Sequence, residues 1–259
     1  MAESVHLTVS GGIARVTLAR PEVRNAFNAE VIERLHEIFT RITAADDVRA
    51  VVLAGEGKVF CGGADVNWMR ASLDLSFDAN VADAELMSDM FRAIDNCPKP
   101  VVARIHGAAL GGGSGLVAVC DIAVAAEDAV FGFTEVKLGI IPATISPFVL
   151  AKIGTSHARA LFLTGERFDA RHAEAIGLVH DVVPSAQLDA AVERRLAELH
   201  SAGPNAIAAA KLLVRRVLDN SYADSRTITT EAIARQRVSP EGQEGLRAFL
   251  ERRPAKFSD

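Results

Sequence analysis

Residues 105–121 read IHGAALGGGSGLVAVCD and hold three consecutive glycines between two apolar runs. The run before them, 100–105, has the composition of a buried β-strand, and the run after them, 116–120, that of a buried helix. Glycine costs backbone entropy and brings no side chain to a core. Three in a row indicate either a tight turn or a backbone that closely approaches a ligand, with N–H groups at a helix start directed at negative charge.

A second glycine site precedes this one and strengthens the ligand interpretation. Residues 51–54 (VVLA) have the pattern of a buried strand, and they are followed by GEGK and then by VFCGGAD at 59–65. Small-residue turns thus occur twice, each after a strand-like run. Two N–H groups that converge on one oxygen form an oxyanion hole, which stabilises charge that develops during a reaction. A carboxylate, Glu135, follows the second turn at loop distance.

This combination of motifs resembles the enoyl-CoA hydratase/isomerase (crotonase) superfamily. The matching segments cover the chain from about residue 7 to residue 257, and they are RP at 20–21 with NAF at 25–27, FCGGAD at 60–65, GAALGGGSGLVAVCD at 107–121, FGFTE at 131–135 and LGIIP at 138–142. The resemblance implies a spiral of ββα units, followed by a helical C-terminal subdomain used in trimerisation. It also implies a division into a core with the active site, 1–200, and a C-terminal subdomain, 201–259.

The pattern along the chain predicts an α/β protein without reference to the family. Strand and helix patterns alternate in the first half, and helices dominate after residue 146. Predicted strands are 5–9, 13–18, 48–54, 101–105, 122–125, 130–131 and 179–183. Predicted helices are 28–43, 65–69, 81–94, 112–120, 146–152, 156–163, 170–176, 187–202, 205–218, 221–237 and 240–251. Asn28 is expected to cap the first helix, and Gly11-Gly12 to form a hairpin turn between the first two strands. Residues 72–82 show no periodicity, so we expect a mobile loop beside the site.

Composition excludes several classes of protein. The chain has 259 residues, 49% of them hydrophobic, and a formal net charge of −5, which argues against a nucleic-acid-binding surface. Its three cysteines are far apart and form no CxxC pair, so neither a disulfide framework nor a metal site is expected. The first residues lack a signal-peptide pattern, and the uncharged runs are shorter than the roughly 20 residues of a membrane span. We therefore expect a soluble cytoplasmic protein.

Three residues are assigned to the chemistry by their positions in the matched motifs. The resemblance implies that the amides of Gly62 and Gly112 form the oxyanion hole and that Glu135 is the acid/base. A glutamate after a β-run is more often a solvated surface residue, and the motif reverses that expectation. Burial in the apolar setting of FTEV would raise its pKa toward a useful range.

The sequence departs from the family pattern at Gly115. Family hydratases with two carboxylates carry a glutamate three residues after the second oxyanion glycine, and here that position is Gly115. Glu135 could act alone, Asp74 or Asp78 could replace the second acid, or the reaction could be double-bond isomerisation with one base. A CoA-thioester-binding protein without turnover is a further alternative.

We favour hydration because residues 135–154, EVKLGIIPATISPFVLAKIG, resemble bacterial hydratases of branched, carboxylated substrates, namely methylglutaconyl-CoA and isohexenylglutaconyl-CoA hydratases. That subgroup tends to have glycine at the position of Gly115. A carboxylated acyl group would need a cation, for which Arg70 and Lys137 are the candidates.

The resemblance also implies a CoA thioester as the substrate, with no permanently bound cofactor. It assigns CoA contacts to Arg24, Asn25 and Ala26 and the adenine pocket to Ala64, Asp65 and Val66. In the family's C-terminal tail, a lysine and a phenylalanine reach CoA on a neighbouring subunit, and Lys256 and Phe257 match them here. The expected assembly is a homotrimer or a dimer of trimers.

Overall fold

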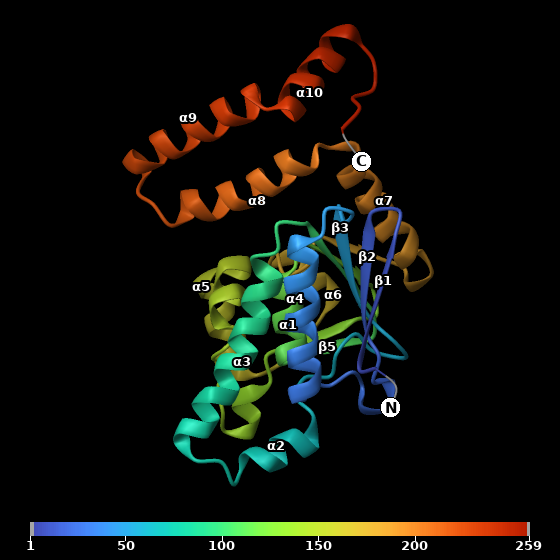
Figure 1. Cartoon of the computed structure of the whole chain (residues 1–259). Coiled ribbons are helices and arrows are strands. Elements are labelled where there is room, and N and C mark those ends of the chain that lie inside the picture. Colours follow the sequence, from blue (N-terminus) through green and yellow to red (C-terminus); the bar gives the residue numbers. More distant parts are fainter. Residues whose placement is uncertain (1–2, 258–259) are drawn as a thin grey trace.

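A six-stranded sheet forms the centre of the protein in this computed structural model, which describes residues 3–257 (Figure 1). Its strand order is β1-β2-β3-β4-β6-β9, with bounds Val5–Ser10, Ile13–Leu18, Ala50–Gly55, Val101–Ile105, Ile122–Ala126 and Asp181–Val183. β1 and β2 form an antiparallel hairpin through the predicted Gly11-Gly12 turn, in which both glycines have positive φ. The remaining pairs are parallel.

Alternating side chains of this sheet pack against helices on both faces. One face carries α1 (Ala29–Ala44), α3 (Phe77–Asp95) and α4 (Gly112–Val119), which share the larger hydrophobic core with it. The other face is covered by α7 (Leu188–Ser201), which forms a smaller core with alternate strand residues. The sheet strands are therefore apolar on both sides, as expected for parallel strands between helices. Asn28 caps α1 as predicted, its Oδ1 accepting from the Val31 amide.

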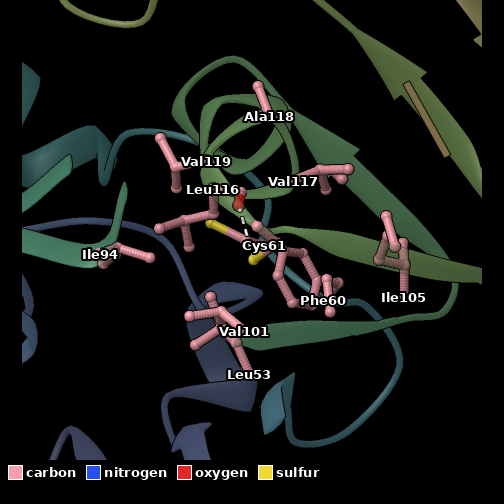
Figure 2. Close-up of a cluster of buried hydrophobic side chains, with 14 of the residues drawn as sticks. Leu53, Phe60, Cys61, Ile94, Val101, Ile105, Leu116, Val117, Ala118 and Val119 are labelled. Atoms are coloured by element: carbon pink, nitrogen blue, oxygen red, sulfur yellow. Dashed lines mark hydrogen bonds between the residues drawn. The ribbon is translucent and has the colours of Figure 1, made fainter. Parts of the chain in front are cut away.

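Helix α4 lies in the middle of the larger core (Figure 2). Its apolar run packs among buried side chains of neighbouring strands and helices; those labelled in Figure 2 outside the helix are Leu53, Phe60, Cys61, Ile94, Val101 and Ile105. The helix is thus surrounded by apolar side chains along its length.

A small second sheet joins β5 (Ala108–Leu110), β7 (Val130–Gly132) and β8 (Arg167–Asp169) in that order. The sequence analysis missed β5 and β8, because each has only three residues and lacks an alternating pattern of its own. Two isolated parallel bridges hold the loop after β3: Cys61 pairs with Ala109 of β5, and Ala64 pairs with Phe27, which precedes α1.

The expected mobile loop over 72–82 is wrong. Helix α2 spans Val66–Ser72, and α3 begins at Phe77, where Ser76 caps it by accepting from the Ala79 amide. Only four residues separate the two helices. The sequence did not reveal the start of α3 because most of its side chains face solvent, and the segment therefore shows no apolar periodicity.

The remaining elements of the body follow the predicted order. The two helices expected between 146 and 163 form α5 (Ser146–Thr164), which is broken at Gly154 by a φ of 72° and a ψ of 165°. Helix α6 spans Ala170–Ala175, and short 3-10 helices cover Pro21–Val23, Glu135–Leu138 and Ser185–Gln187. In the described part of the chain, no helix combines the length and apolarity that a membrane span requires.

The last three helices form an arm apart from the body: α8 (Pro204–Leu218), α9 (Tyr222–Val238) and α10 (Pro240–Glu251) (Figure 1, orange to red). Among residues 3–257, none after Leu199 joins either core cluster. The predicted mixed α/β architecture with a helical C-terminal part is confirmed. The predicted boundary at 200/201 falls at the end of α7, and the independence of the two parts as folding units stays a prediction.

Candidate active site

Most glycines of the run 111–115 are required by packing. A Cβ at Gly112 would lie 2.6 Å from Phe27 Cε2, and one at Gly113 would lie 2.6 Å from the Cys61 carbonyl oxygen. Gly111 has φ 52° and ψ −124°, a conformation that side chains other than glycine rarely adopt. The ring of Phe27 and the loop after β3, at Cys61, therefore contact the backbone at the start of α4 directly.

Ser114 holds this helix start and was missed by the sequence analysis. It is fully buried, and its Oγ lies 2.7 Å from the Ala109 carbonyl oxygen, to which it donates. The same Oγ accepts from the Gly132 amide at 3.4 Å. One hydroxyl thus connects α4 to both β5 and β7. A buried serine inside a glycine run offers no periodic signal, so only its burial reveals this role.

The two glycine-rich segments run side by side in a fixed register. The Cys61 amide donates to the Ala108 carbonyl at 3.0 Å, and the Leu110 amide donates to the Cys61 carbonyl at 3.1 Å, so Cys61 pairs with Ala109 in parallel. Three residues further along both segments, Ala64 comes opposite Gly112. A Cβ on Gly111 would lie 4.0 Å from the Gly63 Cα, which shows that the segments remain close there.

The predicted role of Gly62 as an oxyanion donor is contradicted by its hydrogen bond. The Gly62 amide donates to the Arg24 carbonyl at 2.8 Å, so it is not free for a ligand. Phe27 bonds to both neighbours of Ala64, since its amide donates to Gly63 and its carbonyl accepts from Asp65. Within residues 3–257, the amides of Ala64 and Gly112 donate to no protein acceptor. The sequence alone could not show which amide of this turn, that of Gly62 or that of Ala64, has no protein acceptor.

Glu135 lies against the start of α4. Its Oε1 is 3.3 Å from the position of a Cβ on Gly111, and its Oε2 is buried without a hydrogen-bond partner in the described structure. Burial raises the pKa of Glu135 above its ordinary value, partly opposed by its own backbone N–H. An unpartnered buried carboxyl oxygen beside two unused amides is an unusual combination, and it marks this corner as a candidate site.

The place of a second carboxylate is filled by other side chains. A Cβ on Gly115 would lie 2.3 Å from Ile145 Cγ2 and 3.1 Å from Phe91 Cζ. Both contacting side chains are buried. Gly115 is therefore a packing residue, and the predicted catalytic position holds no acid. Asp74 and Asp78, the predicted replacements, are exposed.

The predicted CoA-contacting residues are divided between surface and interior. Arg24 is exposed, adopts φ 59°, and places its Cβ 3.1 Å from a Cβ position on Gly62, so it lies beside the site. Asn25 is buried, and its Nδ2 lies 2.8 Å from the carbonyl oxygens of Glu56 and Val59. The side chain of Asn25 therefore holds the loop after β3. Ala26 is also buried.

The segment 64–66 combines structural and exposed residues. Asp65 accepts from the Asn67 amide as the cap of α2 and from Arg20 Nη2, both at 2.8 Å. Although burial opposes it, these two donors hold the pKa of Asp65 below its ordinary value. Val66 is 64% exposed. The predicted adenine pocket remains a prediction, because these contacts describe only how the segment is anchored.

The remaining predicted residues are not brought to Glu135. Lys256 and Phe257 lie at the end of the arm, where the ring of Phe257 packs 3.4 Å from a Cβ position on Gly245. Arg70 is exposed and reaches Asn67 at 3.5 Å, and Lys137 is exposed with its stem over Gly165. Within residues 3–257, none of these side chains is shown in contact with Glu135, and their proposed roles stay predictions.

Comparison with known proteins shows which family this chain resembles in sequence and in fold. The family model for enoyl-CoA hydratase/isomerase matches residues 8–259. The chain is similar to an enoyl-CoA hydratase of Shewanella pealeana, with 38% identity, a TM-score of 0.94 and coverage of 98% of this chain and 95% of the other. Pseudomonas aeruginosa AtuE has 34% identity, a TM-score of 0.95 and coverage of 99% and 100%.

An enoyl-CoA hydratase of Alternaria alternata is 38% identical over 206 residues, which are 79% of this chain and 67% of that protein. The fold predicted from the resemblance is confirmed by these solved structures. The chain belongs to the enoyl-CoA hydratase/isomerase family, the crotonase superfamily.

Proposed function

We propose that this enzyme adds water to a 2-enoyl-CoA thioester. The observation that carries the proposal is the pairing of two unused amides, those of Ala64 and Gly112, near the carboxyl group of Glu135, whose Oε2 is buried without a partner. The thioester oxygen would accept from both amides, and the N-terminal end of α4 adds a favourable dipole there. Ala64 replaces Gly62 in this account because the Gly62 amide is already bonded.

Glu135 would carry out both proton transfers of the reaction, which move the same proton twice. As a carboxylate it accepts a proton from water, whose oxygen bonds to C3 while the alkene electrons move onto the thioester oxygen as an enolate. Glu135 then returns the proton to C2 as the enolate collapses, which gives the 3-hydroxyacyl thioester. All atoms of water enter the product. Both transfers use the same carboxyl group, so they occur on one face of the alkene.

The acyl group is proposed to be branched or carboxylated, of the 3-methylglutaconyl-CoA type, on the basis of residues 135–154. The test is a panel of 2-enoyl-CoA thioesters with unbranched, branched and carboxylated chains. Hydration removes the conjugated enoyl absorbance and adds the mass of one water. The proposal fails if no member of the panel gains that mass. A preference for unbranched chains would overturn only the proposed substrate class.

Isomerisation of a 3-enoyl-CoA is the second candidate, and the filled space at Gly115 favours it. With Ile145 and Phe91 in the place of a second carboxylate, Glu135 is left to move protons by itself, and moving one proton between C2 and C4 needs one base. A 3-enoyl-CoA substrate separates the two reactions. Isomerisation creates the absorbance that hydration removes, without a change of mass.

We also propose a homotrimer or a dimer of trimers. The arm exposes large apolar side chains, among them Leu218, Tyr222, Val238 and Phe249, each at least 75% exposed. Such side chains commonly mark a surface that another protein covers. Light scattering coupled to gel filtration measures the mass directly, and a monomer at micromolar concentration would contradict the proposal. Contacts of Lys256 and Phe257 with CoA would then belong to a neighbouring subunit.

A further inference from the structure

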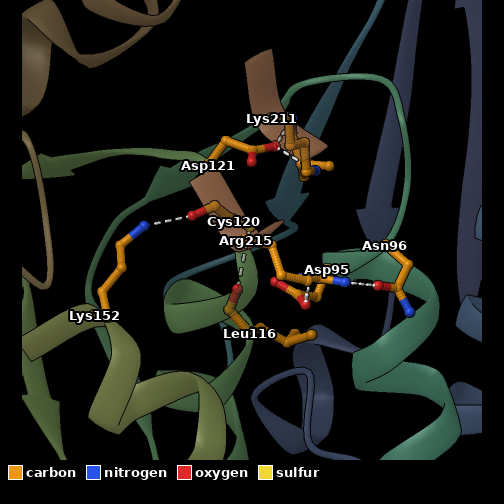
Figure 3. Close-up of polar contacts among 9 residues, drawn as sticks. Asp95, Asn96, Leu116, Cys120, Asp121, Lys152, Lys211 and Arg215 are labelled. Carbon is orange, nitrogen blue, oxygen red and sulfur yellow. Dashed lines mark hydrogen bonds and ion pairs between the residues drawn. The ribbon is translucent and has the colours of Figure 1, made fainter. Parts of the chain in front are cut away.

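Charged side chains join the arm to the body on the side where α4 ends (Figure 3). Lys211 of α8 donates to Asp121 Oδ2 at 2.7 Å, and the two side chains are only 17% and 27% exposed. One turn further along α8, Arg215 pairs with Asp95 and donates to Asn96 at the end of α3. We call these five residues the latch.

Apolar packing contributes little to this junction. Helix α8 has no buried residue, and the body's core clusters end at Leu199 within the described residues. Ion pairs on an open surface contribute little to stability, but removing one partner of a shielded pair leaves the other charge desolvated and unpaired. Burial already raises the pKa of Asp95, opposed by Arg215 and Lys211. The latch therefore supplies the charged contacts by which α8 is joined to the body.

Asp121 connects the latch to the backbone beside α4. Its Oδ2 accepts from the Val101 amide at 2.7 Å, and its own amide donates to the Val101 carbonyl at 2.9 Å. The residue before it, Cys120, ends α4, and its carbonyl accepts from Lys152 Nζ at 2.5 Å. A cation at the C-terminal end of a helix is favourable. Asp121 and Lys152 thus hold the end of α4 opposite to Gly112.

The short length of α4 transmits a displacement from one end to the other. Eight residues span about 12 Å, so the helix moves as a rigid rod. A catalytic donor must be held within roughly half an ångström of its productive position. We propose that the latch positions α4 through Asp121, so that docking of the arm sets the place of the Gly112 amide and Lys211 is a positioning residue. This inference rests on the proposed function only where the experiment below measures turnover.

The experiment compares Lys211→Met and Arg215→Met with Arg216→Met, an adjacent exposed arginine on α8 that makes no ion pair in the described structure. Deuterium uptake is measured in peptides covering 204–218 and 112–121, at a protein concentration where light scattering gives equal masses. We expect faster exchange of both peptides in the two latch variants and no change in Arg216→Met. Turnover should fall roughly fivefold with KM changed less than twofold. The reason is that a displaced Gly112 amide would weaken its hydrogen bond to the thioester oxygen, and that bond strengthens in the transition state.

Lys211→Arg keeps the charge and should restore most of the turnover. The proposal is overturned if exchange rises only in 204–218 while kcat stays unchanged, since the arm would then detach without effect on α4. It is equally overturned if neither peptide changes. Failure of the proposed function is distinguishable, because wild-type protein would then turn over no enoyl-CoA thioester while the exchange measurements still report on the latch.

Discussion

The two turns of helix α4 use the same residue type for opposite purposes. In the first turn, Gly112 keeps an unbonded amide beside the carboxylate of Glu135. Three residues later, Gly115 is packed against Ile145 and Phe91, and the nearest atoms to its Cβ position are all apolar carbons. The start of the helix therefore offers an amide without a protein acceptor among the described residues, and the position three residues later is filled by apolar side chains. A glycine motif can combine a chemical requirement and a packing requirement within four residues.

Removing the carboxylate from the polar end should have the largest effect. Glu135→Gln keeps the shape of the side chain but cannot accept a proton from water, so kcat should fall roughly thousandfold. Glu127→Gln, at an exposed glutamate, is the matched control and should be neutral. Both are measured as loss of enoyl absorbance. Retention of more than a tenth of wild-type kcat in Glu135→Gln would show that another group moves the proton.

The sealed turn is tested by a double-mutant cycle. Gly115→Ala places a Cβ 2.3 Å from Ile145 Cγ2, and we expect it to lower the free energy of unfolding by about 2 kcal/mol. Ile145→Ala alone leaves a cavity and should cost about 3 kcal/mol. The double variant should cost at least about 1 kcal/mol less than the sum, because the new methyl group enters the vacated space.

Denaturant titration of the four proteins measures this coupling. Gly245→Ala with Ile145→Ala is the control pair, since Gly245 lies in the arm and its Cβ position makes only ordinary contacts, 3.4 Å or more, with Phe257. That pair should be additive. Additivity of the 115/145 pair as well would mean that Ile145 does not fill the place of a second carboxylate.

A smaller effect follows from the raised pKa of Glu135. Because burial raises the folded-state pKa above the unfolded value, the protonated form is favoured in the folded protein, and this contribution is lost as pH rises through the folded pKa. Glu135→Gln should therefore be more stable than wild type by about 1 kcal/mol at about pH 8. The gain should vanish at about pH 4, where the wild-type carboxyl is protonated. A pH-independent difference would argue against a buried, unpartnered carboxylate.

The smallest effects are expected at the predicted partners of a substrate carboxylate. Arg70 and Lys137 are exposed, and neither is shown beside Glu135. Replacing either by Met should raise KM for a carboxylated enoyl-CoA by about threefold or less, with no change for an unbranched chain. A loss above about thirtyfold, confined to the carboxylated substrate, would show that one of them binds that group directly.

Sequence patterns predicted the order of long elements well because hydrophobic periodicity decides them. The Asn28 cap, the Gly11-Gly12 hairpin and the helices of the arm are all found where the pattern places them. The short strands β5 and β8 lacked such a pattern, since their pairing depends on residues far away in the chain.

The candidate site was predicted only in part for the same reason. Gly112 and Glu135 were predicted from their motifs and lie, respectively, at the start of α4 and beside it, and their catalytic roles stay predictions. The bonded state of the Gly62 amide depends on Arg24, and the enclosure of Gly115 depends on Ile145, thirty residues away. Neither contact leaves a local signal. The register of two distant loops, set by Cys61 and Ala109, decides which amides are free.

The most direct test is a crystal structure with a saturated acyl-CoA thioester, which binds but cannot be hydrated. The account predicts that the thioester oxygen lies within about 3.1 Å of the amide nitrogens of both Ala64 and Gly112, with the Glu135 carboxyl group facing C2 and C3. A thioester oxygen bound to the Gly62 amide, or bound away from both predicted amides, would contradict it.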